Sequence, residues 1–261
     1  MPRFAANLTM LFTEYPFLER FDRAAAAGFQ AVEFLFPYDQ DVPAIAAALR
    51  RNRLAQVNFN LPAGDFAGGE RGIANDPHRV DAFRDGVERA IAIAGELGCL
   101  RLNCLVGLAL PEVPIALQWD VLTDNLRFAA ERTAEAGITL LVEPLNNLDT
   151  PGYLLVHTDQ ALELLDRAGN PNLKLQYDCY HMQRMEGNLT ATLVEHLARI
   201  GHIQIAACPG RHQPGSGEIN YPFIFEALDA AGYDGWVSLE YNPVPNTEAS
   251  LAWLRDWGYW T

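Results

Sequence analysis

The sequence contains almost no lysine: Lys174 is the only one among 261 residues. With 33 acidic and 19 basic side chains, the formal net charge is -14. A surface this acidic repels phosphate, so we expect neither a nucleic-acid partner nor binding to an anionic membrane surface. The acidity keeps a protein in solution and is compatible with a cationic ligand.

Long apolar runs and paired cysteines are also missing. No stretch approaches the roughly 18 uninterrupted apolar residues of a membrane-spanning helix. The N-terminal segment lacks the apolar centre of a signal peptide. The four cysteines form no C-x-x-C pair, which is typical of reduced, buried thiols. These absences predict a cytoplasmic protein without a membrane partner.

Short apolar segments alternate with longer segments of helical period along the whole chain. The predicted strands cover residues 4–8, 31–34, 55–60, 101–105, 139–143, 173–178, 202–206 and 236–240. The predicted helices cover residues 17–27, 43–51, 80–97, 119–136, 159–168, 190–199, 223–231 and 248–257. This alternation is typical of parallel βα units. Because no linker or shift in composition interrupts it, we expect one domain over residues 1–261.

Glycine positions support a closed barrel. Gly28, Gly98, Gly137 and Gly232 each follow a helical segment and precede a strand, as glycines that end helices do. An open doubly wound sheet is the alternative, but it usually carries a glycine-rich turn after its first strand. Residues 7–12 contain no glycine. The sequence therefore predicts a single (β/α)₈ TIM barrel, for which this length is usual.

Polar residues stand at the predicted strand ends, where such a barrel has its active site. The first four strands carry Asn7, Glu33, Asn58, Asn60 and Asn103. The last four carry Glu143, Asp178, Gln204 and Glu240 in apolar contexts. A buried carboxylate is costly unless it is paired or bound to a cation. Arginine partners are the alternative, but none stands beside these strand ends in the sequence.

Three carboxylates and one amide make an all-oxygen ligand set. Oxygen ligands suit Mg²⁺ or Mn²⁺ better than Zn²⁺ or Cu²⁺. We therefore expect one divalent metal ion, with Mg²⁺ as the first choice and Mn²⁺ as the second.

Loop residues supply candidates for substrate binding. His181 follows Asp178 by three residues, and Arg211 lies in a glycine-rich loop over 209–218. Another glycine-rich loop, 61–72, contains Glu70 and Arg71 and is predicted either to cover the barrel mouth or to be an ordinary surface loop. We expect His181, Arg211, Glu70 and Arg71 to bind the substrate.

Strand alternation places Lys174 and His202 on the inward face of their strands. We interpret both as polar residues of the barrel interior that satisfy each other or neighbouring groups. A Schiff-base lysine is the alternative, although Lys174 lies deep below the strand end.

Several stretches together resemble the bacterial hydroxypyruvate isomerase family, within the xylose-isomerase-like barrels. They are FAANLTMLFTEYPFLERF at 4–21, VEFLFPYD at 32–39, NLPAGDFAGGERGIA at 60–74, NCLVG at 103–107, VEPLNN at 142–147, LQYDCYHMQRMEG at 175–187 and PGSGEINY at 214–221. The resemblance implies that Glu143, Asp178, Gln204 and Glu240 bind the metal. It also implies that Glu143 and Glu240 transfer the proton. Related ketose 3-epimerases have a histidine where this chain has Gln204.

The implied reaction interconverts hydroxypyruvate and tartronate semialdehyde through an enediolate, so the expected partner is a small anionic hydroxy-oxo acid. A 2-oxotetronate isomerase is the main alternative. A ketose 3-epimerase, an inosose-type dehydratase and a non-catalytic sugar-binding barrel fit less well. A DNA-repair endonuclease would need three zinc ions, many histidines and a basic face. A homo-oligomer is compatible with the sequence.

Overall fold

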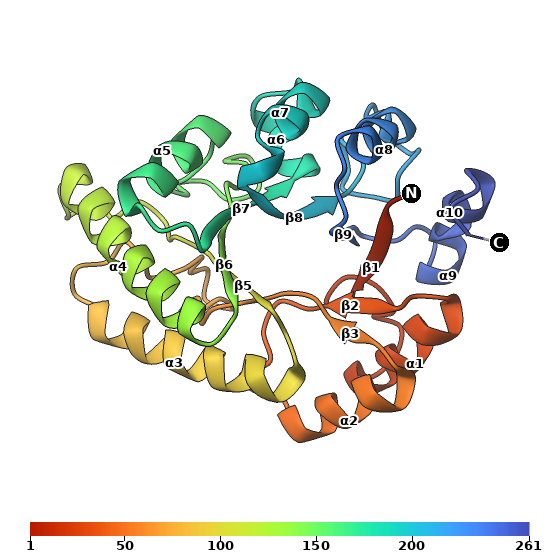
Figure 1. The fold of residues 1–261 in the computed structure, drawn as a ribbon, viewed down its shortest axis with the longest axis horizontal. Helices are drawn as coiled ribbons and strands as arrows, with labels where there is room; N and C mark the ends of the chain where they lie inside the picture. Colours follow the sequence, from red (N-terminus) through yellow and green to blue (C-terminus); the bar gives the residue numbers. More distant parts are fainter. Residues whose placement is uncertain (261) are drawn as a thin grey trace.

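The computed structural model describes residues 1–260, in which parallel strands curl into a barrel surrounded by helices (Figure 1). The strands are β1 (Arg3–Asn7), β2 (Ala31–Glu33), β3 (Ala55–Gln56), β4 (Phe59–Asn60), β5 (Arg101–Cys104), β6 (Thr139–Val142), β7 (Leu173–Asp178), β8 (Ile200–Ile205) and β9 (Trp236–Leu239). Their order is β3-β2-β1-β9-β8-β7-β6-β5-β4. Each strand pairs in parallel with its neighbours, as the sequence predicts.

The two end strands of this order close the barrel. Only Val57 and Asn58 separate β3 from β4 in the chain. The Val57 N–H donates to the Val32 carbonyl on β2, at 2.9 Å. The Leu61 N–H donates instead to the Asn103 carbonyl on β5, at 2.8 Å. The predicted strand 55–60 therefore pairs with β2 in its first half and with β5 in its second half. It occupies one of the eight strand positions of the barrel. The predicted TIM barrel is confirmed.

The helices follow the predicted pattern with three exceptions. They are α1 (Phe17–Ala27), α2 (Val42–Asn52), α3 (Val80–Leu97), α4 (Ile115–Glu135), α5 (Thr158–Ala168), α6 (Cys179–Met185), α7 (Leu189–Glu195), the 3-10 helix η1 (Leu197–Arg199), α8 (Tyr221–Ala230), α9 (Thr247–Ser250) and α10 (Ala252–Asp256). The predicted helices 190–199 and 248–257 are each broken in two, and α6 was not predicted. Among the described helices, none combines the length and apolarity needed to cross a bilayer.

Alternate side chains of β1 point to opposite faces of the sheet, and those of Ala5 and Asn7 point into the barrel. Ala5 packs with Ala31 and Val57 in a small apolar cluster of its own, apart from the large core that contains Phe4 and Ala6. Two residues beyond Ala5, Asn7 points to the same face of the strand. The interior is thus apolar at the start of the strands and polar at their ends.

The expectation for His202 is confirmed, and Lys174 lies on the same face of β7 as Gln176 and Asp178, at the opposite end of the strand, where it pairs in register with the buried Leu141. The register shift between β7 and β8 lies in β8, because the consecutive residues Leu175 and Gln176 pair with Ile200 and His202. The Lys174 ammonium donates to the Ala198 carbonyl at 2.7 Å and is partly exposed. His202 is fully buried inside the barrel, with Nε2 2.8 Å from a Glu33 carboxylate oxygen.

Candidate active site

A layer of buried polar side chains fills the barrel at the carboxyl ends of its strands. It comprises Asn7, Glu33, Asn58, Asn60, Asn103, Glu143, Gln176, Asp178, Gln204 and Glu240. Strand register places Asn7 beside Glu33, Asn60 beside Asn103, and Asp178 beside Gln204. Each of the eight strand positions of the barrel therefore contributes to this polar layer.

Side-chain amides hold both predicted catalytic carboxylates. The Glu143 Oε2 atom accepts hydrogen bonds from Asn103 at 2.8 Å and from Gln176 at 2.9 Å. The Glu240 Oε1 atom accepts one from Asn7 at 3.2 Å. These donors are neutral, so they orient the carboxylates without cancelling their charge.

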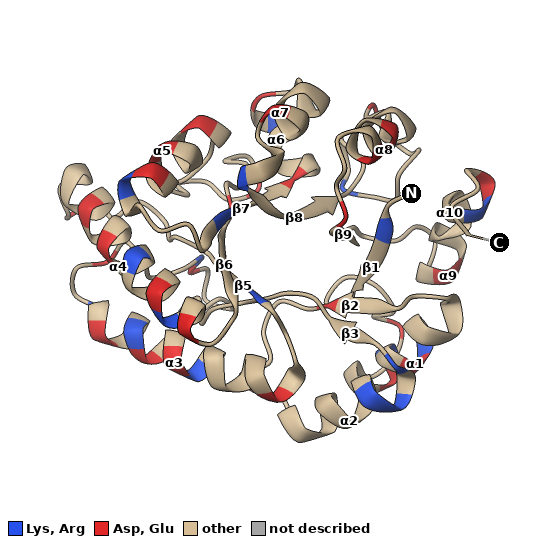
Figure 2. Ribbon diagram, in the orientation of Figure 1, with Lys and Arg blue, Asp and Glu red and all other residues tan. Residues whose placement is uncertain are grey.

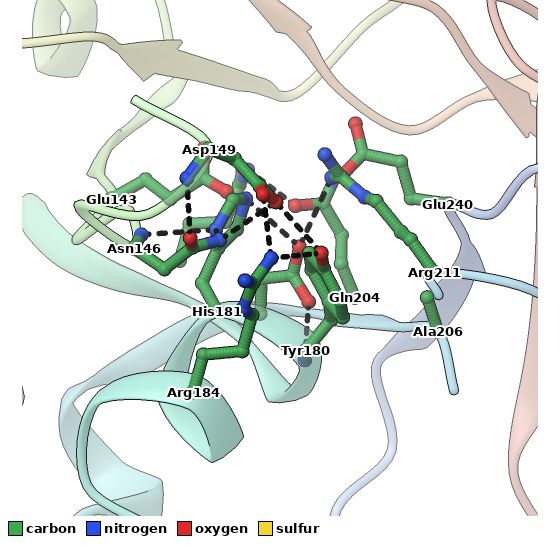
Figure 3. A network of polar contacts seen from close by, with 12 residues as sticks. Glu143, Asn146, Asp149, Tyr180, His181, Arg184, Gln204, Ala206, Arg211 and Glu240 are labelled. Carbon is green, nitrogen blue, oxygen red and sulfur yellow. Dashed lines mark hydrogen bonds and ion pairs between the residues drawn. The ribbon is translucent and has the colours of Figure 1, made fainter. Parts of the chain in front are cut away.

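Arg211 reaches this layer from the loop after β8, beside Glu240 and Tyr180 (Figure 3). Its Nη2 atom lies 2.6 Å from Glu240 and 3.4 Å from Asp178. Its guanidinium lies 5.0 Å from the centre of the Tyr180 ring. The alternative of an arginine partner is therefore met for Glu240 and Asp178, because a loop folds Arg211 back over the strand ends.

His181 is held as a hydrogen-bond donor toward the site. Its Nδ1 atom accepts the backbone N–H of Asn146 at 3.0 Å, so the neutral ring carries its proton on Nε2. Nε2 lies 3.5 Å from an Asp178 carboxylate oxygen. Burial lowers the His181 pKa to about 4, so the ring is neutral near pH 7.

Three buried carboxyl groups, Glu143, Asp178 and Glu240, lie close together in the layer. Burial raises the pKa of Glu143 well above its usual range, and the charges of Glu240 and Asp178 raise it further. Burial also raises the pKa of Glu240 to about 8, against the opposing effect of Arg211. Among the described residues, Glu143, Asp178 and His181 can bring one ligand atom each within 4.8 Å of one another. A carboxylate-rich cluster of this size fits a hard cation.

A cavity of about 110 Å³ opens above the layer. It is lined by Leu35, Asn60, Phe66, Arg71, Leu105, Glu143, Leu145, Asp149, Thr150, His181, Arg211 and Glu240. Three of the four predicted substrate-binding residues, His181, Arg211 and Arg71, therefore face one space. Glu70 is not in this lining: its carboxylate pairs with Arg79 and accepts the Asp65 N–H.

Comparison with known proteins identifies the family. Residues 21–257 match the family model of the xylose isomerase-like TIM barrel. The chain belongs to this family. It is 50% identical to hydroxypyruvate isomerase of Escherichia coli, over 97% of this chain and 98% of that one. It is 46% identical to 2-oxo-tetronate isomerase of Cupriavidus necator, over 98% and 99%. The predicted resemblance and the prediction of an isomerase are confirmed.

A solved barrel of the family has nearly the same shape. The crystal structure described as AP endonuclease, family 2, from Brucella melitensis gives a TM-score of 0.96 at 47% identity. The match covers 98% of this chain and 99% of that one.

Sequence reasoning missed a polar cluster beside the candidate active site. Asp149 accepts hydrogen bonds from the Tyr180 hydroxyl at 2.7 Å and from the Asn146 amide at 3.1 Å, and it pairs with Arg184 (Figure 3). The cluster fixes the loop after β6 against α6, and thereby places His181. No spacing in the sequence signals this contact, because it joins a loop to a helix that was not predicted.

Proposed function

We propose that the protein interconverts hydroxypyruvate and tartronate semialdehyde. The observation that carries this proposal is that two buried glutamates, Glu143 and Glu240, and Arg211 line one small cavity. Two carboxylates suit the removal and return of a proton, and an arginine suits a substrate carboxylate. The identity to E. coli hydroxypyruvate isomerase supports this substrate.

We further propose that Glu143, Asp178, Gln204 and Glu240 hold one divalent ion, Mg²⁺ or else Mn²⁺. The all-oxygen donor set and the raised pKa values of the two glutamates support a hard cation. Such an ion would act as a Lewis acid that stabilises negative charge on the substrate oxygens. His181 is a donor in its bonded tautomer, so we assign it to the substrate.

The two glutamates move the proton. One removes a proton from the CH₂OH carbon of hydroxypyruvate, and the electron pair forms the enediolate. One glutamate then returns a proton to the neighbouring carbon, while the hydroxyl hydrogen passes between the two substrate oxygens. Asn103 and Gln176 fix Glu143, and Asn7 fixes Glu240, so both bases keep their orientation during the exchange.

Arg211 and Arg71 bind the substrate carboxylate, and the His181 Nε2–H donates to a substrate oxygen. The apolar side chains in the lining of the same cavity limit the length of the substrate. They are Leu35, Phe66, Leu105 and Leu145. A space of about 110 Å³ suits an acid of three or four carbons.

A four-carbon substrate is the second candidate, because the identity to a 2-oxo-tetronate isomerase is nearly as high. The deciding experiment compares kcat/KM for hydroxypyruvate and 2-oxotetronate, with Mg²⁺ and again after EDTA. A higher kcat/KM for hydroxypyruvate supports the first proposal, and the reverse result replaces it with the second. Activity unaffected by EDTA contradicts the metal site.

DNA repair fits the molecule poorly despite the description of the Brucella structure. DNA binding needs a basic surface, whereas outer helices such as α3 and α4 carry acidic and basic residues together (Figure 2) and the net charge is -14. The four cysteines are buried and free, which supports a location in the reducing cytoplasm. Homo-oligomer formation stays a prediction.

A further inference from the structure

Glu33 lies within the polar layer, outside the lining of the substrate cavity. Its residue is 1% exposed and lies on β2. Its Oε1 atom accepts the Asn7 amide at 2.9 Å and the Gln204 amide at 2.8 Å. Its Oε2 atom lies 2.8 Å from His202 Nε2. Three buried side chains thus meet one carboxylate to which the proposed reaction assigns no role.

An ionised carboxylate accepts hydrogen bonds and donates none. Gln204 must therefore turn its NH₂ group toward Glu33 and its oxygen the other way. On that side, the Gln204 oxygen accepts the Gln176 amide at 2.7 Å.

The orientation of Gln176 is fixed in the same way. Its NH₂ group also donates to the Glu143 carboxylate at 2.9 Å, and its oxygen accepts the Asn58 amide at 2.8 Å. Gln204 is therefore held from both sides, with Glu33 at one end and Gln176 at the other.

Amide orientation decides whether a glutamine can hold a cation. The two ends of the amide are nearly equal in size, but only the oxygen has a lone pair for a metal. A glutamine without a fixed partner can rotate and present its NH₂ group. Partners behind metal ligands commonly change metal affinity by about 10- to 100-fold.

We infer that Glu33 is a positioning residue of the metal site, which directs the Gln204 oxygen toward the ion. Through Asn7, whose amide also donates to Glu240, Glu33 further fixes the orientation of the second glutamate. His202 anchors the opposite oxygen of Glu33. The inference rests on the proposed function, since that proposal makes Gln204 and Glu240 metal ligands.

The test is the Mn²⁺ affinity of Glu33→Gln, measured without substrate by isothermal titration calorimetry. The new amide is neutral and has one oxygen in place of two, so it holds the Asn7 and Gln204 amides and His202 less firmly than the carboxylate does. We expect Mn²⁺ to bind about 10- to 100-fold more weakly, with the circular dichroism spectrum unchanged. The matched control is Glu14→Gln, which alters a carboxylate bonded to Thr247 and should leave the affinity unchanged.

A double-mutant cycle tests the route through Gln204. Gln204→Met removes the amide but keeps the length of the side chain. In that background Glu33→Gln should cost much less affinity than in the wild type. The full loss in both backgrounds would show that Glu33 does not act through Gln204, and would overturn the inference.

The outcomes separate this inference from the proposed function. If the wild type binds Mn²⁺ and Glu33→Gln binds it equally well, the inference alone is wrong. If the wild type binds no Mn²⁺, the proposed metal site fails and the inference fails with it. Should Glu33→Gln not fold, Glu33→Asp is the second variant. It keeps the negative charge, but its side chain is one methylene shorter, so the carboxylate lies farther from Gln204. Wild-type affinity in folded Glu33→Asp would then overturn the inference.

Discussion

The guanidinium of Arg211 lies 2.6 Å from the Glu240 carboxylate and also contacts Asp178. It thereby offsets part of the negative charge of two carboxylates that we assign to the metal, while lining the cavity that we assign to the substrate. A cation bound by these carboxylates would free Arg211 for the substrate carboxylate. We therefore expect Arg211 to act on substrate binding rather than on metal binding.

The variant Arg211→Met should raise KM for hydroxypyruvate by about 10- to 100-fold, since a charge-assisted hydrogen bond contributes about 1.5–3 kcal/mol. Its Mg²⁺ affinity should stay equal or rise, because a competing positive charge is gone. Steady-state kinetics and metal titration check both statements. Arg199→Met, which breaks an exposed pair with Asp166, is the control. An unchanged KM in Arg211→Met would remove this residue from substrate binding.

Glu143→Gln and Glu240→Gln should each lower kcat by at least about 10²-fold, the usual contribution of a general acid or base. The pKa of Glu143 is raised by burial, so its neutral replacement should not lower the melting temperature of the metal-free protein. Initial rates and thermal melts measure the two effects. The control is Glu88→Gln, an exposed partner of Arg132. Near-normal turnover in either active-site variant contradicts the proton-transfer pair.

Metal-stripped protein should lose stability as pH rises. The Glu240 pKa is about 8 in the folded protein, above its ordinary 4.5, so the folded state binds more protons between these values. Its contribution is fully present below about pH 4.5 and is lost as pH rises toward 8. The melting temperature of Glu240→Gln should depend less on pH in this window than that of the wild type. Equal pH dependence of the two melting temperatures would contradict the raised pKa.

Arg71 and Glu70 are neighbours in the chain, but the structure gives them different surroundings. Arg71 lines the cavity with its guanidinium 4.0 Å from the Phe66 ring centre, whereas Glu70 pairs with Arg79. We expect Arg71→Ala to raise KM by about tenfold or more, as loss of one charged hydrogen bond would. Glu70→Ala should raise KM far less. Kinetics of the two variants decide the matter, and a larger effect in Glu70→Ala would restore the direct role predicted from the sequence.

The barrel could be predicted because its signals are local. Each strand is a short apolar run, and glycines such as Gly28 and Gly98 adopt the left-handed conformation that ends a helix. Glu143 and Glu240 could be placed at the site because each directly follows an apolar strand. The order of strands and helices then brings both to the same end of the barrel.

The parts that could not be predicted depend on contacts between distant segments. Arg211 reaches Glu240 only because its loop folds back over β8. The register shift between β7 and β8, where Ile200 and His202 pair with consecutive residues of β7, has no signal in the sequence. The amide network could not be derived either, since the direction of each amide depends on partners from other strands.

The most direct test of the account is proton NMR of hydroxypyruvate with the protein in D₂O, first with Mg²⁺ and then with EDTA. We predict that tartronate semialdehyde appears with Mg²⁺, that deuterium enters at the reacting carbons, and that EDTA stops both. No product and no exchange in the presence of Mg²⁺, or equal rates with EDTA, would contradict a metal-assisted isomerase of hydroxypyruvate.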